Sequence, residues 1–381
     1  PMSRILKVMI VLLAITAMVA PSVFAEDRLG LSGQMRVRGW YLDDGGDSTN
    51  TYADQRLRIG GKLSVAEGVS ITFRTDFSEQ DWGSDASLGR QTTWQLDRAH
   101  LDLANDQFAF RAGQQNFLMG HSTIDFQDTG AMFTIKGAVP VTLIFSVYDD
   151  TDGAGGPSDQ YIYGVKVGHK TDSYASDVFV VGANNGAEQD VYAIGATLAM
   201  DLGAVKLDAE LDVFTGDHSD TIDAMGTQLY VDAAMAASEM ATVGGRFYYA
   251  MGADSNEAQY TMLGNGFNGW DPANYGPLEN EDLFYVGANF DFTGDAAGVI
   301  GGQVYADIKA SDATGFTASL AYLTPEEDNN TVVDSALLIN LGMTYDLMAN
   351  TSLAAQVQYG DVDAPNTDET TAAGVALYVN F

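Results

Sequence analysis

Stretches in which apolar and polar side chains alternate residue by residue recur from Leu29 to the end of the chain. In LGLSGQMRVRGWYL, residues 29–42, Met35 and Val37 share one parity, and Arg36 and Arg38 share the other. Strict alternation predicts a β-strand with one apolar face and one polar face. The stretches are roughly ten residues long, which is the length that a tilted strand needs to cross a membrane.

The polar faces carry charges that need water. In AVKLDAELDVF, residues 204–214, Lys206, Asp208, Glu210 and Asp212 follow one another on a single face. Four charges facing a dry core would each cost several kcal/mol. One side of this strand is therefore expected to meet water, and the other to meet lipid or a protein core.

The first residues resemble an export signal. Arg4 and Lys7 precede a short apolar run and a cleavage motif that ends at Ala25. We expect a signal peptide over residues 1–25 and a single domain over residues 26–381. The alternative, a membrane anchor, is disfavoured because the apolar run is shorter than the roughly 20 residues of a spanning helix.

The net charge and the lengths of the connections narrow the class of protein. The net charge of −34 argues against a nucleic-acid binder, and the absence of Cys excludes disulfides and thiolate sites. Tight turns at 66–68, 104–106, 201–203 and 347–350 alternate with long acidic segments such as DDTDGAGGPSD and DVDAPNTDETT. Short periplasmic turns and long extracellular loops are typical of outer-membrane barrels.

The expected fold class is all-β, a transmembrane antiparallel up-and-down β-barrel of about 18 strands. Thirteen strands fit between Leu29 and Met251, and five more lie near 298–309, 315–323, 335–345, 351–361 and 372–381. The segment 252–297 leaves 16 to 20 strands open. If LFYVGANFDF, residues 283–292, joins the barrel, it needs a partner such as 258–266.

Alternation also predicts which charges point into the lumen. A basic wall is expected from Arg36, Arg38, Arg56, Arg58, Lys62, Arg74, Arg98 and Arg111. An acidic wall is expected from Asp208, Glu210, Asp212 and Asp232. Two facing walls of opposite charge would set a transverse field that selects polar solutes. The alternative is a plugged lumen in which these residues pair with one another.

Other candidate sites are weaker. Residues 116–130 form the third long connection. In many outer-membrane barrels the third loop folds into the pore, and the sequence leaves open whether residues 116–130 do so. His121, Ser122 and Asp125 share that connection but lack a nucleophile elbow, so we expect no enzyme. No histidines have metal-ligand spacing and no nucleotide motif is present, so we expect no cofactor, apart from Ca²⁺ held loosely by the acidic loops.

The chain ends in AGVALYVNF, and its terminal Phe381 resembles the C-terminal assembly signal of Gram-negative outer-membrane barrels. QRLRIGGKLSVAEGVSITFRTDF and the following WQLDRAHLDLANDQFAFRAGQQNF resemble porins, particularly alginate-export-like porins. The matching positions are Arg98, Leu101, Asp102, Leu103, Arg111, Gly113 and Gln115. The detailed match covers about the first third of the chain.

The resemblance implies an outer-membrane porin for passive diffusion of small polar or charged solutes, including anions or acidic sugars. A plugged or structural barrel and a polysaccharide export channel are the alternatives. The implied partners are outer-membrane lipid and lipopolysaccharide, the barrel-assembly machinery and small polar solutes. A homotrimer and a monomer both stay open.

Overall fold

The computed structural model describes residues 28–43, 49–82, 94–121, 123–149, 160–184, 190–253, 257–260, 263–264, 275–278, 297–327, 334–363 and 369–381. Every regular element in these ranges is a β-strand. Within them, no helix is long and apolar enough to span a membrane. The expected signal peptide, residues 1–25, lies outside the described residues.

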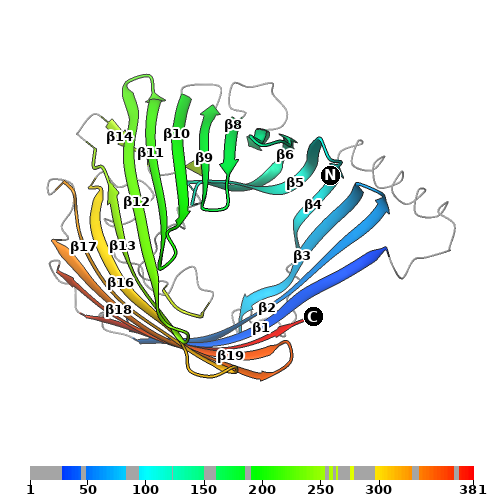
Figure 1. The fold of residues 1–381 in the computed structure, drawn as a ribbon. Helices are drawn as coiled ribbons and strands as arrows, with labels where there is room; N and C mark the ends of the chain where they lie inside the picture. The colour runs from blue at the N-terminus through cyan, green and yellow to red at the C-terminus, as the bar shows by residue number, and fades with distance from the viewer. Residues whose placement is uncertain are drawn as a thin grey trace.

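Eighteen long strands form the wall of the molecule (Figure 1). They are β1 (Leu29–Asp43), β2 (Thr49–Ala66), β3 (Val69–Asp81), β4 (Trp94–Ala104), β5 (Phe108–Met119), β6 (Ile124–Ile135), β7 (Val141–Asp149), β8 (Gln160–Lys170), β9 (Tyr174–Asn184), β10 (Asp190–Asp201), β11 (Val205–Ser219), β12 (Ile222–Ser238), β13 (Ala241–Ala250), β16 (Val299–Lys309), β17 (Thr314–Thr324), β18 (Ser335–Met348), β19 (Thr351–Asp363) and β20 (Thr370–Asn380).

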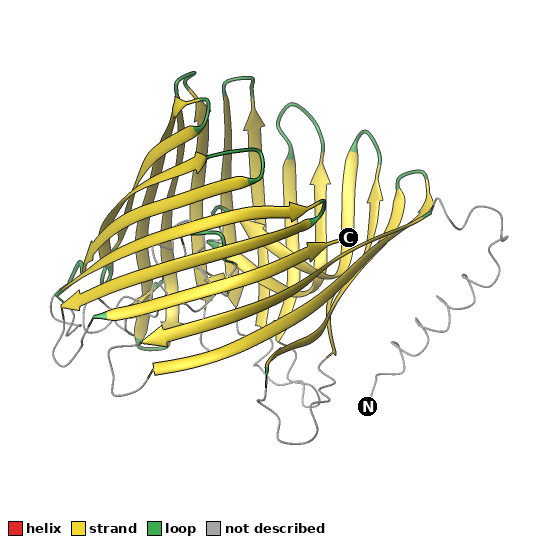
Figure 2. Cartoon of the chain, turned by 90° about the horizontal axis from the view of Figure 1, so that it is seen from below, coloured by secondary structure: helices red, strands yellow, loops and turns green. Residues whose placement is uncertain are grey.

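The sheet closes on itself. Each long strand pairs antiparallel with the next along the chain, and β13 pairs with β16. The last strand, β20, then pairs with β1 from Gln34↔Asn380 to Asp43↔Thr371. Figure 2 shows the tilted strands around the barrel. The prediction of an 18-stranded antiparallel barrel is confirmed.

Two further strands are short and lie outside the antiparallel order. β14 (Glu257–Gln259) pairs in parallel with β12 at Asp223–Met225, and β15 (Leu263–Gly264) pairs in parallel with β6 at Ile124–Asp125. The alternative that made 258–266 a barrel strand is therefore wrong. Its proposed partner, residues 283–292, lies outside the described residues.

The two faces of the barrel differ as the alternation predicts. Large apolar side chains of the outer face are exposed, including Leu31 (60%), Val304 (60%), Leu341 (56%) and Val375 (61%). In water such a belt would cost about 25 cal/mol per Å² of apolar surface, whereas lipid removes that cost. Arg36, Arg38 and Arg56, on the opposite parity, are less than 10% exposed.

The four tight turns that the sequence predicts connect β2–β3, β4–β5, β10–β11 and β18–β19. Gly68 (φ 71°), Gly203 (φ 83°) and Asn350 (φ 60°) adopt the left-handed conformation there. Gly and Asn are the residues that reach this region at low cost, which is why such short turns can reverse the chain.

Candidate functional site: the inner wall and the hairpin inside the barrel

The structure places the predicted basic wall on the inner face of β1–β5, where its members form a ladder of cross-strand ion pairs. Five of these side chains bind carboxylates of the same wall, in the pairs Arg38–Asp54 (2.9 Å), Arg58–Asp76 (2.7 Å), Arg74–Asp97, Arg98–Asp97 (3.9 Å) and Arg111–Asp102 (2.6 Å). These described pairs join five arginines to four carboxylates. Pairing lowers the cost of placing arginines side by side.

Part of this wall is open to water. The side chains of Arg58, Arg74, Arg98 and Arg111 are 27–42% exposed. With Lys62 they belong to the inner face, and Lys62, Arg98 and Arg111 line a hollow of about 590 Å³. A charged solute could contact these guanidinium groups without displacing a protein side chain.

The β5–β6 hairpin leaves the wall and bends into the barrel. β4 pairs with β5 only over Ala109–Gln114, and β7 pairs with β6 only over Thr129–Ile135. The hairpin tip, residues 115–128, retains only the pairing between β5 and β6 and the short pairing with β15. The connection that the sequence left open therefore folds inward.

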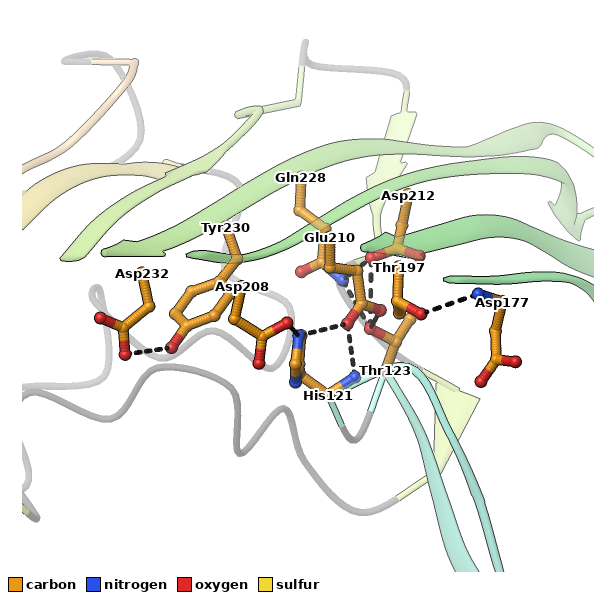
Figure 3. Close-up of polar contacts among 10 residues, drawn as sticks. All are labelled: His121, Thr123, Asp177, Thr197, Asp208, Glu210, Asp212, Gln228, Tyr230 and Asp232. Carbon is orange, nitrogen blue, oxygen red and sulfur yellow. Dashed lines mark hydrogen bonds and ion pairs between the residues drawn. The ribbon is translucent and has the colours of Figure 1, made fainter. Parts of the chain in front are cut away.

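The hairpin tip docks on the inner face of β11 (Figure 3). The backbone N–H of His121 donates to Glu210 Oε2, and Thr123 Oγ1 lies 2.5 Å from Glu210 Oε1 and 3.2 Å from Asp212 Oδ2. Gln228 on β12 donates to Asp212 over 2.7 Å. These protein donors replace water around two carboxylates that are 1% and 0% exposed.

Gly120 makes this close docking feasible. Its φ is 65°, and a Cβ at this position would lie 2.0 Å from Glu210 Oε1. Any other residue would combine backbone strain with a clash against the buried carboxylate. The glycine therefore fixes how near the tip approaches β11.

A dry apolar layer lies between the hairpin tip and the wall. Phe117 and Phe126 stack at 4.8 Å, and they pack against inner side chains of β7–β12. The buried partners on the wall are Ile144, Ile162, Phe179, Val181, Val191, Ala193, Phe214 and Ala224. This sector of the inner wall is apolar, so the hairpin removes it from water.

The acidic wall differs from the sequence prediction. Glu210 and Asp212 do face inward, but they are buried beneath the hairpin tip and do not contact open water. Asp208 binds His121 Nε2 at 3.1 Å, and Asp232 accepts hydrogen bonds from Arg246 (2.9 Å) and Tyr305 (2.7 Å). The sequence predicted that water would hydrate these carboxylates. Hydrogen-bond donors from other segments of the chain take the place of that water.

His121 is a titratable group of the hairpin tip that faces β11. Burial opposes its protonation, but the hydrogen bond to Asp208 and the nearby carboxylates of Glu210 and Asp232 outweigh burial, and the pKa of His121 is raised. Its ring also lies 5.1 Å from the ring of Tyr230. His121 therefore links the hairpin tip to Asp208 on β11. Its partner is Asp208, and Ser122 lies outside the described residues.

Sequence reasoning missed the apolar sector and the inward hairpin. One signal was available, because DVFVVGAN at residues 177–184 is apolar at four consecutive positions and so reads as a strand buried on both faces. It also missed the row of amides formed by Gln303, Asn340, Gln356 and Gln358, which are 1–3% exposed. The available signal was their position on the polar parity of β16, β18 and β19.

No family model and no curated protein matches the chain. Solved structures do match. A BenF-like porin from Pseudomonas fluorescens Pf-5 has a TM-score of 0.63 at 11% identity, over 94% of this chain and 99% of that chain. OccK9 (OpdG) from Pseudomonas aeruginosa has 0.62 at 12%, over 94% and 99%, and OccAB4 from Acinetobacter baumannii has 0.61 at 11%, over 94% and 100%.

The chain has the fold of Gram-negative outer-membrane porins. Identities this low establish the fold alone. Together with the apolar outer belt, this fold locates the chain in the outer membrane. The finer resemblance to alginate-export-like porins stays a prediction.

Proposed function

We propose that the chain is a porin that provides a water-filled channel for passive diffusion of small polar or charged solutes. One observation carries the proposal. Four arginines of the basic wall are 27–42% exposed inside the barrel, whereas the carboxylates Glu210 and Asp212 are covered. Solutes that enter the lumen therefore meet the basic wall, and the hairpin closes off the apolar sector.

The exposed charge favours anions, including acidic sugars. Four arginines of this wall stay partly exposed, and guanidinium groups bind carboxylate and phosphate oxygens in a planar, bidentate manner. Pairing with Asp76, Asp97 and Asp102 leaves each contact weak enough for release, which passage requires. The acidic loops at the rim oppose this preference by repelling anions at the mouth.

The alternative is a barrel whose lumen is plugged, with a structural role. Two chain segments do enter the lumen, the hairpin tip and residues 275–278. A polysaccharide export channel would need a path wide enough for a polymer. We favour the diffusion channel because the hollow at the basic wall is lined by charged groups that water reaches.

Single-channel recording in a planar bilayer, with protein refolded from residues 26–381, tests the proposal. Stable ohmic steps are expected. A barrel that folds by circular dichroism but shows no conductance would overturn the diffusion channel and support the plugged lumen.

The proposed partners are outer-membrane lipid, lipopolysaccharide and the barrel-assembly machinery. Assembly would use the terminal strand, where Phe381 pairs with Gly33 through two backbone hydrogen bonds of 2.7 and 3.0 Å. The proposal includes no cofactor. Ca²⁺ binding by acidic loops concerns segments such as 150–159, which lie outside the described residues.

A further inference from the structure

A second segment of the chain, Tyr275–Leu278, lies against the inner wall. It contacts side chains of β16, β19 and β20 and Trp40 of β1, the first strand of the basic wall. Tyr275 donates from its hydroxyl to Asp307 (2.9 Å), and Leu278 donates from its backbone N–H to Gln356 Oε1 (3.2 Å). Leu278 is buried with Trp40, Ala354, Ala372, Ala376 and Tyr378.

The wall beneath this segment is shaped to receive it. A Cβ at Gly342 would lie 2.3 Å from Pro277, and a Cβ at Gly374 would lie 2.5 Å from Leu278. On the segment itself, a Cβ at Gly276 would lie 2.2 Å from the amide carbon of Gln356. The missing side chains create a shallow cradle, which we call the amide cradle. Its members are Trp40, Tyr305, Gly342, Gln356, Gln358 and Gly374.

The segment uses only part of the hydrogen-bonding capacity of the amide cradle, through the bond from the Leu278 N–H to Gln356 Oε1. Gln356 and Gln358 are 2% and 1% exposed. Among the described residues, Gln356 Nε2 and both amide atoms of Gln358 have no hydrogen-bond partner. A buried amide atom without a hydrogen-bond partner costs about 1–3 kcal/mol. With residues 275–278 bound, the cradle therefore keeps amide atoms whose hydrogen bonds are not made.

The charged groups at the edge of the amide cradle are already occupied. Arg246 binds Asp232 at 2.9 Å and lies 4.8 Å from the ring centre of Tyr305, and Tyr275 occupies Asp307. What the cradle offers is neutral amides beside aromatic rings. Hydroxyl groups both donate and accept hydrogen bonds, as amides do, and the C–H faces of a sugar ring pack on aromatic faces.

We propose that the amide cradle is a binding subsite for a neutral, polyhydroxylated solute, and that residues 275–278 occupy it until such a solute displaces them. The inference rests on the proposed channel only for how the solute reaches the cradle. Because the segment competes with the solute, the apparent affinity falls by the fraction of molecules in which the segment is bound.

The test uses Trp40 as a reporter in a Trp82→Phe, Trp94→Phe, Trp270→Phe background, with maltotriose as the probe. A saturable shift of Trp40 emission is expected. Leu278→Ser weakens the competing segment and should tighten maltotriose binding at least tenfold. Gln358→Leu should abolish binding in both backgrounds, and Gln95→Leu on β4 serves as the matched control that leaves it unchanged.

A purely structural cradle would not bind more tightly when Leu278 is replaced. No saturable response in the parent and in Leu278→Ser, unchanged affinity in Gln358→Leu, or equal binding of the acidic trigalacturonate would each overturn the proposal.

A disulfide provides a second test, because the chain contains no Cys of its own. Pro277→Cys combined with Gly342→Cys should hold the segment in the cradle and block binding when oxidised, and should restore binding when reduced. The fluorescence titration is done in detergent and does not depend on conductance. A negative result for the channel can therefore be distinguished from a negative result for the amide cradle.

Discussion

Thr123 and Gln228 take the place of water around two buried carboxylates. Sequence reasoning expected water around Glu210 and Asp212, and the structure supplies protein donors in its place. The donors could not be identified from the sequence, because Thr123 lies 87 residues from Glu210 along the chain. No local pattern encodes such a contact, whereas the inward direction of Glu210 and Asp212 follows from parity alone.

Replacing Thr123 by Val should weaken the docking of the hairpin tip by about 1–3 kcal/mol, because Glu210 and Asp212 lose a buried hydroxyl partner. Increased hydrogen exchange across residues 115–128 measures this. Thr221→Val, at an exposed turn, is the matched control. Unchanged exchange in Thr123→Val would show that the apolar layer alone holds the hairpin.

The raised pKa of His121 predicts a pH dependence of the same contact. A group whose pKa rises on docking contributes fully below its ordinary pKa of about 6.5, and the contribution disappears as the pH rises through the raised value. Asp208, Glu210, Tyr230 and Asp232 are the titratable groups that face the ring.

Hydrogen exchange of the hairpin tip, corrected for intrinsic rates, should therefore show weaker docking at pH 9 than at pH 6. His121→Gln should remove most of that difference while keeping the backbone bond to Glu210. An equally large pH effect in His121→Gln would assign it to the carboxylates instead.

At the scale of elements, β7–β10 behave unlike the rest of the barrel. Their inner face carries a cluster of apolar side chains, such as Ile144, Ile162 and Phe179, and the hairpin covers this cluster. The strands themselves and their tight turns could be predicted, because alternation and turn residues are local signals. The inward bend of β5–β6 could not, because it depends on matching an apolar hairpin to an apolar sector formed by distant strands.

Phe179→Ala on β9 should cost about 3–5 kcal/mol, because it opens a cavity in the layer beneath the hairpin. Val178→Ala, its outward neighbour at 54% exposure, is the matched control and should cost far less. Resistance of the folded band to heat in detergent reports the difference. Equal loss in both variants would contradict a dry layer on the inner side.

At the scale of the whole molecule, eighteen strands and their order followed from the sequence, because each strand pairs with its chain neighbour. The segments that fill the lumen could not be predicted from the sequence, because they leave the barrel wall and contact strands that are distant along the chain. Of the predicted acidic wall, Glu210 and Asp212 are covered by the hairpin tip, whereas the side chain of Asp208 is 44% exposed.

Closure of the barrel brings Phe381 over Gly33, where the terminal ring remains 56% exposed. Phe381→Ala should slow assembly without changing the final fold, because the backbone pairing with Gly33 survives. The rate at which the heat-resistant folded band appears measures this. An unchanged rate would separate Phe381 from assembly.

The central claim is that solutes pass along the basic wall. Reversal potentials across a KCl gradient test it most directly, comparing the parent with Arg56→Glu/Arg58→Glu. The matched control, Lys136→Glu/Lys170→Glu, changes net charge equally at exposed turn-end positions. The account predicts a marked shift towards cations in the first variant and little in the second. Equal reversal potentials in all three proteins would contradict it.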